Sequence, residues 1–309
     1  MKIYDCILYN GEYEILNLRI QLLHKWVDKF IIVESSETFS GLPKELHFQK
    51  EIESFSSYLN QIEYYPVSIP ECNSAWEREH YSRNTLKVIR DYEDNDLLII
   101  SDADEIVNLE YLLDNYEFPK PSRIELKTFY NFFNLSSNEL CQTTLIAPYK
   151  YLRDINIGDR NKYKTIFPHL IKDKKGKNGG HFTYMFGWNV ERYIEKIKSF
   201  SHEELKTPYF TNPSRIKKCL LYNFDLYDRF QFQYKVIDLN DCFPQLYHLI
   251  HSEDHLRDHF KSLNIHLVLS LFTRLFDPYF WYVKKTRFRV WGSRHKQKLK
   301  RILKNWKQR

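Results

Sequence analysis

Hydrophobic and polar positions follow two different periods along the first hundred residues of the chain. Apolar-rich runs at 2–9, 30–33, 62–67 and 97–100 predict strands, several of them buried on both faces. Between them, apolar side chains recur at helical spacing within 14–29 and 76–92, which predicts two helices. Strands that alternate with helices are typical of a doubly wound sheet. The pattern therefore predicts an α/β fold with a mostly parallel, Rossmann-type sheet flanked by helices.

A dense acidic cluster follows the fourth predicted strand. Leu97 to Ile100 run directly into Ser101-Asp102-Ala103-Asp104-Glu105. In extended backbone Asp102 and Asp104 point the same way, at the edge of the sheet where α/β proteins bind ligands. Two convergent carboxylates can hold a hard divalent cation, which in turn can neutralise a diphosphate. The cluster indicates metal-dependent handling of a nucleotide-linked substrate, with a solvated turn as the alternative.

No Gly-rich phosphate-binding loop follows the first strand, so the sequence contains neither a P-loop nor a dinucleotide fingerprint. The phosphates would then be held by a metal ion and by basic side chains. Arg78 and Arg83 precede the acidic cluster and could reach a diphosphate, or they could pair with carboxylates of their own helix. Glu34 ends the second strand and could accept hydrogen bonds from a base or ribose, or it could cap a helix.

Composition indicates a large folded core and argues against several classes of protein. The 309 residues are 43% hydrophobic and 17% aromatic, far from the composition of a disordered chain. The five cysteines are widely spaced and form no C-x-x-C pair, which argues against a zinc knuckle or a disulfide framework. The sequence shows neither a signal peptide nor an apolar run of about 18 residues, so we expect a cytoplasmic protein.

The carboxyl-terminal region has a different character. Residues 284–309 contain twelve Lys and Arg and no Asp or Glu, and aromatic residues are interleaved with them from Tyr279 to Trp306. Such segments often lie at a bilayer interface. Apolar spacing from Leu256 to Leu275 predicts an amphipathic helix before them. We predict a main domain over 1–255 and a helical, basic extension over 256–309. Residues 279–309 could contact an anionic membrane surface or remain a solvated tail; a nucleic-acid partner is not expected.

Ordered motifs extend over roughly residues 3–230. They are Asn10-Gly11-Glu12, Val27 to Ser35, Thr38 to Lys44, Trp76-Glu77-Arg78-Glu79 with Arg83, Ser101 to Ile106, Gly179 to Tyr184 and Lys196 to Glu204. Together they resemble glycosyltransferase family 17, which includes enzymes that add a bisecting N-acetylglucosamine to the core mannose of N-glycans. The resemblance implies a GT-A-type fold, a UDP-sugar donor, a divalent metal (Mn²⁺ or Mg²⁺) and inversion at the anomeric carbon.

Roles for individual residues follow from these motifs. We expect Asp102, Asp104 and His202 to hold the metal. The nucleotide is expected to contact residues that end the first strands or precede the acidic cluster: Asn10, Glu12, Glu34, Arg78, Arg83 and Asp102. Inversion needs one general base on the acceptor side. Glu204 is the preferred base, with His181 and His202 as alternatives, and each of these could instead be structural.

The resemblance does not extend to the N-glycan acceptor, because the sequence departs from the family in two places. The animal Golgi enzymes of the family carry an amino-terminal membrane anchor and stem, whereas this sequence starts with the predicted first strand. Gly179-Gly180-His181 replaces the family's Gly-Trp-His. A surface glycan or a lipid-linked glycan suits a cytoplasmic enzyme with a basic tail. The aromatic and amide-rich segment Phe129 to Asn134 is expected to line the acceptor side. A non-catalytic carbohydrate- or membrane-binding module and a nucleotidyltransferase remain alternative functions.

Overall fold

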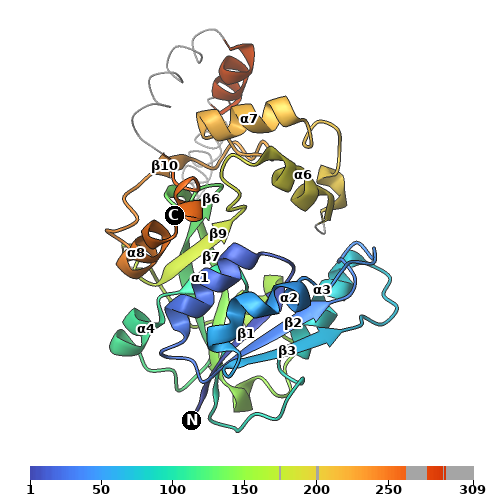
Figure 1. The fold of residues 1–309 in the computed structure, drawn as a ribbon, viewed down its shortest axis with the longest axis vertical. Helices are drawn as coiled ribbons and strands as arrows, with labels where there is room; N and C mark the ends of the chain where they lie inside the picture. Colours follow the sequence, from blue (N-terminus) through green and yellow to red (C-terminus); the bar gives the residue numbers. More distant parts are fainter. Residues whose placement is uncertain (174, 200–201, 262–276, 288, 290–309) are drawn as a thin grey trace, which may run out of the picture.

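The computed structural model describes residues 1–173, 175–199, 202–261, 277–287 and 289 (Figure 1). Its first half alternates strands with helices, as the hydrophobic pattern predicts. The elements are β1 (Ile3–Tyr9), α1 (Tyr13–Leu23), β2 (Lys29–Ser35), α2 (His47–Glu51), η1 (Ile52–Tyr58), β3 (Ile62–Val67), α3 (Ala75–Thr85) and β4 (Leu97–Asp102).

The second half adds antiparallel strands and a group of helices. Its strands are β5 (Glu105–Val107), β6 (Ser122–Tyr130), β7 (Leu135–Pro148), β8 (Leu170–Ile171), β9 (Gly179–Thr183) and β10 (Tyr234–Val236). Its helices are α4 (Leu109–Asn115), η2 (Tyr149–Tyr151), η3 (Arg160–Lys162), α5 (Tyr163–Ile166), α6 (Val190–Ser199), η4 (Glu203–Leu205), α7 (Pro213–Tyr222), α8 (Pro244–Ser252) and α9 (Asp254–Arg257).

The described strands form one mixed sheet in the order β3-β2-β1-β4-β7-β6-β9-β5, with β10 beside β7 and β8 beside β6. The strands β1 to β4 are parallel, and five of the nine strand pairs in the described chain are parallel. The predicted α/β fold, a mostly parallel sheet flanked by helices, is confirmed. In the register, Leu8 lies opposite Asp102 and Tyr9 opposite Glu34, so β1, β2 and β4 end at a common edge.

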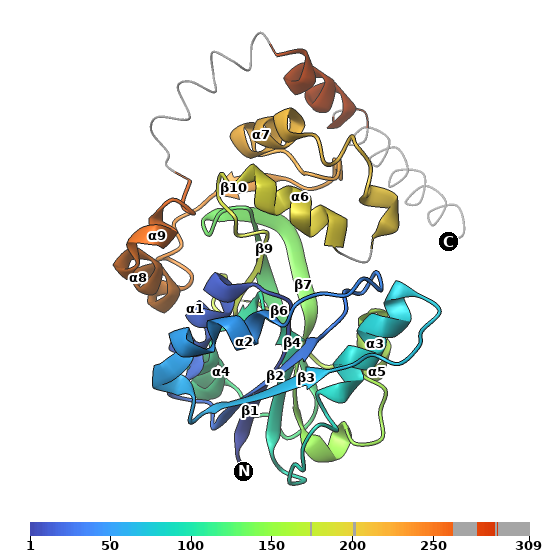
Figure 2. The ribbon, with the colours of Figure 1, turned by 45° about the vertical axis from the view of Figure 1, so that its right-hand side comes forward.

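Packing on both faces of the sheet fixes that edge in place. One core cluster joins Leu16 and Ile20 of α1 to the strands, and a second packs Leu86 and Tyr163 against the opposite face. A further cluster joins α6, α7 and the helix over 278–287. Figure 2 shows β7 curving away from the parallel strands toward β10, α6 and α7. The molecule therefore places a helical layer beyond the ends of β1 and β4.

The predicted extension over 256–309 lies largely outside the described residues, including most of the amphipathic helix expected from Leu256 to Leu275. In the described part, Phe280 and Val283 are buried in the cluster of α7, whereas Trp281 and Tyr282 are exposed. Part of the aromatic set expected at a membrane is thus used for internal packing. None of the helices in the described residues has the length and apolar content needed to cross a bilayer.

Candidate functional site

A cleft of about 860 Å³ lies between the common edge of β1, β2 and β4 and the helical layer. The edge strands contribute Leu8, Tyr9, Val33, Ser35 and Asp102. The opposite wall comes from β6, β7, β9 and α6, with Thr128, Tyr130, Glu139, His181, Thr183, Arg192 and Lys196. Residues far apart in the sequence thus meet at the predicted ligand-binding edge.

Arg19 of α1 fixes the shape of the acidic turn that follows β4. Its side chain is fully buried and pairs with Asp5 at 2.6 Å. The same guanidinium donates to the main-chain oxygens of Asp102 at 2.7 Å and Glu105 at 3.1 Å. A buried guanidinium needs such partners, because burying an unpaired charge is very costly. The buried Arg19 side chain therefore fixes the backbone of the turn through hydrogen bonds to its carbonyl oxygens.

Asp102 is held between two arginines. Its Oδ1 accepts from Arg83 Nη1 at 2.7 Å, and its Oδ2 forms an ion pair with Arg160. Burial opposes ionisation of Asp102, but the guanidinium groups of Arg160 and Arg83 outweigh it and hold the pKa of this carboxyl below its ordinary value. Both carboxylate oxygens are therefore occupied by protein cations.

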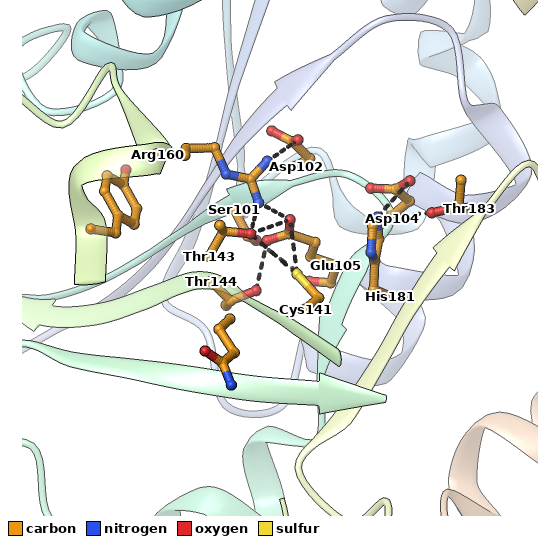
Figure 3. Close-up of polar contacts among 12 residues, drawn as sticks. Ser101, Asp102, Asp104, Glu105, Cys141, Thr143, Thr144, Arg160, His181 and Thr183 are labelled. Carbon is orange, nitrogen blue, oxygen red and sulfur yellow. Dashed lines mark hydrogen bonds and ion pairs between the residues drawn. The ribbon is translucent and has the colours of Figure 1, made fainter. Parts of the chain in front are cut away.

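Arg160 also reaches Glu105, as Figure 3 shows. The Glu105 carboxylate is fully buried and accepts from Thr143 Oγ1 at 3.1 Å and Thr144 Oγ1 at 2.6 Å. A buried carboxylate of this kind needs a charge partner, and Arg160 supplies it. No motif in the sequence points to Arg160, which lies 58 residues after Asp102 at the start of η3.

The segment over 155–158, just before Arg160, is hydrogen-bonded to the segment that carries Arg83. Asn84 Oδ1 accepts from the Ile157 amide at 2.9 Å, and Lys87 Nζ donates to the Ile155 carbonyl at 2.6 Å. Gly158 lies so close to α3 that a Cβ there would be 2.6 Å from the His80 carbonyl oxygen. The two arginines on Asp102 are thus positioned by one packed unit.

Asp104, in the acidic turn, faces His181 of β9, and both side chains line the cleft (Figure 3). Asp104 Oδ2 lies 3.4 Å from His181 Nε2, and Thr183 Oγ1 lies 2.9 Å from the same nitrogen. Burial lowers the pKa of His181, but the Asp104 carboxylate outweighs it, so the net pKa is well above the ordinary value. Each side chain is about a quarter exposed, so a ligand in the cleft can reach both.

The residues predicted to contact the nucleotide divide into two groups. Asn10, Glu12 and Arg83 line the cleft, and Glu12 pairs with Lys196 of α6. Arg78 is not part of the cleft lining; it donates to the carbonyls of Phe39 at 3.4 Å and Cys72 at 3.2 Å, so it closes a surface loop instead.

Glu34 is fully buried and outside the cleft lining. One oxygen accepts from Lys44 Nζ and the His47 amide, both at 2.8 Å. The other accepts from the Phe48 amide and the Tyr64 hydroxyl, both at 3.0 Å. Four donors saturate the carboxylate, two of them at the start of α2. Of the two roles expected from the sequence, the structure supports helix capping.

His202 and Glu204 lie together at the rim of the cleft. Their side chains are 47% and 68% exposed, with His202 Nδ1 2.9 Å from Glu204 Oε1. The His202 ring packs edge-on against Trp76 at 5.6 Å. Among the described residues, no three His, Cys, Asp or Glu side chains are grouped as a metal site. The structure therefore does not bring His202 together with Asp102 and Asp104.

The segment Phe129 to Asn134 contributes less to the cleft than expected. Tyr130 lines it, but Phe129, Phe132 and Phe133 are buried in the core clusters. Alternation along β6 explains the burial of Phe129, because neighbouring strand residues point to opposite faces. Phe132 and Phe133 follow the end of β6 at Tyr130.

Comparison with known proteins decides the family. The family model of glycosyltransferase family 17 matches residues 1–261, which include the whole cleft lining. The chain belongs to glycosyltransferase family 17. A solved structure of 4-diphosphocytidyl-2C-methyl-D-erythritol synthase is also similar, with a TM-score of 0.33 and 14% identity over 57% of this chain and 92% of that chain. A similarity this weak says nothing about substrate. A comparison with curated proteins found no match.

The cleft of this family 17 glycosyltransferase is acidic. Nine carboxylates line it: Glu12, Glu14, Glu37, Glu79, Asp102, Asp104, Glu105, Glu139 and Glu204. Six lysines and arginines oppose them: Lys44, Arg83, Arg160, Arg192, Lys196 and Arg229. A diphosphate entering this cleft would meet an excess of negative charge, which favours the simultaneous binding of a cation.

Proposed function

We propose that this glycosyltransferase moves a sugar, N-acetylglucosamine or another hexose, from a UDP-sugar to a hydroxyl of a glycan or lipid-linked glycan, with inversion and with a bound divalent cation. The observation that carries the proposal is the Asp104–His181 pair at the centre of an acidic cleft. Family membership supplies the reaction class, and the charge excess explains why an anionic donor needs a cation there.

Asp104 and His181 suit Mn²⁺ or Mg²⁺. Their facing atoms are 3.4 Å apart. At this separation both side chains would be able to hold one ion. A carboxylate oxygen and the nitrogen of a neutral imidazole are suitable donors, so binding of the cation would displace the proton from His181. The diphosphate could complete the shell. When bound, the cation would stabilise negative charge on the departing diphosphate.

Other residues of the cleft would orient the donor. The nucleoside would lie at the common edge of β1 and β2, beside Asn10 and Ser35. Arg83 and Arg160 hold Asp102 in its ionised form and keep the acidic turn rigid. The acceptor hydroxyl would approach from the wall formed by β6 and β7, opposite the leaving diphosphate, since inversion requires attack from the opposite face of the sugar.

The carboxyl-terminal helix is proposed to attach the enzyme to an anionic membrane surface. Trp281, Tyr282, Lys284 and Lys285 are exposed on the helix over 278–287. Aromatic side chains beside cations are typical of interfacial helices, and a lipid-linked acceptor would be present at such a surface. Co-sedimentation with anionic vesicles should be lost when 284–309 is deleted; unchanged binding would remove the membrane role.

Release of UDP from UDP-N-acetylglucosamine tests the proposed reaction. The wild-type protein should release UDP faster with Mn²⁺ than with a chelator, and Asp104→Ala should abolish the Mn²⁺ effect. Pyrophosphate as the product would indicate a nucleotidyltransferase, and saccharide binding without release would indicate a binding module. A thermal-shift scan of UDP- and GDP-sugars with Mn²⁺ would identify the donor, because a ligand stabilises the state that it binds.

A further inference from the structure

Glu139 is a carboxylate on the acceptor wall of the cleft, on β7. Its side chain is half-buried and accepts a hydrogen bond from the Tyr130 hydroxyl at 2.6 Å. In the part of the chain that the structure describes, no lysine or arginine forms an ion pair with it. We infer that Glu139 is the general base that takes the proton of the attacking hydroxyl, an assignment that rests on the proposed function.

Three other carboxylates of the cleft are less suitable as bases. Glu12 pairs with Lys196, and Glu14 with Arg192 at 2.7 Å. A paired cation stabilises the ionised carboxylate and weakens it as a base. Glu204, the base expected from the sequence, is 68% exposed at the rim.

The backbone of β7 is irregular at Glu139. Lys127 pairs with Leu140 and Phe129 with Ser136. Between these two pairs the chain advances four residues along β7 but only two along β6, so β7 bulges. The Glu139 backbone amide donates to Ser137 Oγ of the same strand at 2.9 Å. Bulges of this kind re-aim a side chain and are common beside active sites. Because the last pair of β7 with β4 is Leu145 with Ile100, the bulge lies beyond the end of β4, over the cleft.

Two neighbours on β6 complete the site. Burial raises the pKa of the Tyr130 hydroxyl, which therefore stays protonated and orients the Glu139 carboxylate. Thr128 lines the cleft opposite His181 in the strand register, and its side chain is almost fully buried. Its Oγ1 has no hydrogen-bond partner in the described chain. An unpaired buried hydroxyl is costly, so a small movement of Thr128 toward a substrate hydroxyl would gain a hydrogen bond.

The step balances with the groups named. The acceptor oxygen forms a bond to the anomeric carbon while the bond from that carbon to the diphosphate oxygen breaks. UDP leaves with the electron pair of the broken bond. Glu139 takes the acceptor proton and becomes a neutral acid, which later returns the proton to water.

Azide separates a base from a structural carboxylate. With Mn²⁺ and UDP-N-acetylglucosamine, water serves as the acceptor, and Glu139→Gln should lower UDP release by about 100-fold. Azide is already an anion and needs no base, so it should restore UDP release in Glu139→Gln and yield a glycosyl azide. Tyr130→Phe should show a smaller loss. Glu195→Gln, on the exposed side of α6 and outside the cleft, is the matched control.

Several outcomes would overturn the assignment. An unchanged rate in Glu139→Gln would do so, as would a loss that azide fails to restore while the melting temperature stays at the wild-type value. An azide-restored loss in Glu204→Gln with an active Glu139→Gln would move the base to Glu204. A wild-type protein that releases no UDP from any sugar nucleotide would overturn the proposed function itself, and this assignment with it.

Discussion

The guanidinium of Arg19 donates to the main-chain oxygen of Asp102 across 2.7 Å, although the two residues are 83 positions apart. The same side chain is paired with Asp5 in the fully buried interior. The acidic turn of the active-site cleft is therefore anchored to the hydrophobic core by one side chain. This anchoring explains how a short turn between two strands can hold Asp104 toward the cleft.

Replacing Arg19 should destabilise the fold strongly. Arg19→Met leaves the Asp5 carboxylate buried without its partner, which typically costs about 3–5 kcal/mol. Urea denaturation should show this loss in the free energy of unfolding. The double variant Asp5→Leu with Arg19→Met should recover part of it, because no unpaired charge remains. An Arg19→Met protein as stable as the wild type would show that the buried pair is not as described.

Arg160 should matter for both stability and turnover. Arg160→Met removes the cation that pairs with the buried Glu105 and one of the two that hold Asp102. We expect a loss of about 3 kcal/mol in unfolding free energy. A fall in UDP release on the order of tenfold or more should accompany it, since the turn loses its support. Arg160→Lys should recover only part of either loss, because lysine lacks the planar fork. Full recovery by lysine would argue against the bridging geometry.

The stability of the protein should depend on pH through Asp102. The folded pKa of this carboxyl lies below its ordinary value of 3.8, so ionisation of Asp102 favours the folded state. Its contribution is fully present above about pH 5 and is lost as the pH falls through the ordinary pKa toward the folded one. The difference in unfolding free energy between wild type and Asp102→Asn should therefore be largest near neutral pH and shrink in acid. A constant difference across this range would contradict the depressed pKa.

Metal-linked nucleotide binding should depend on Asp104 and His181 more than on Asp102. UDP with Mn²⁺ should raise the melting temperature of the wild type, since ligands stabilise the state that they bind. Asp104→Ala should abolish the Mn²⁺-dependent part, and His181→Ala should weaken Mn²⁺ binding by a factor on the order of ten or more. Asp102→Asn should retain the Mn²⁺ dependence, because Arg83 and Arg160 already occupy its oxygens. Equal losses in Asp102→Asn and Asp104→Ala would place the cation between both carboxylates.

The parts of the molecule that the sequence predicted well are those set by local pattern. The strand Leu97–Asp102 is a continuous apolar run that ends in acids, and its place in the sheet follows from alternation with helices. Glu34 shows where local pattern fails, because a carboxylate at the end of a buried strand looks the same whether it meets a ligand or caps a helix. Its donors from His47 and Phe48 become visible only in three dimensions.

The missing parts of the site depend on contacts between distant segments. No sequence pattern near Arg160 indicates that the preceding residues pack on α3 or that the Arg160 side chain reaches Asp102. Glu139 is equally hidden, because a bulge in β7 is set by pairing with β6 and leaves no mark in the hydrophobic pattern. Phe280 belongs to an aromatic, basic segment by sequence, yet it packs against Tyr222 and Phe224 in the core.

Anomalous diffraction from crystals grown with UDP and Mn²⁺ is the most direct test of the central claim, that a cation at Asp104 and His181 neutralises the donor diphosphate. We predict one strong manganese peak within ligating distance of both side chains and of the diphosphate oxygens, with Asp102 still paired to Arg83 and Arg160. Bound UDP with no manganese peak at that position, or a peak on Asp102 with Arg160 displaced, would contradict the account.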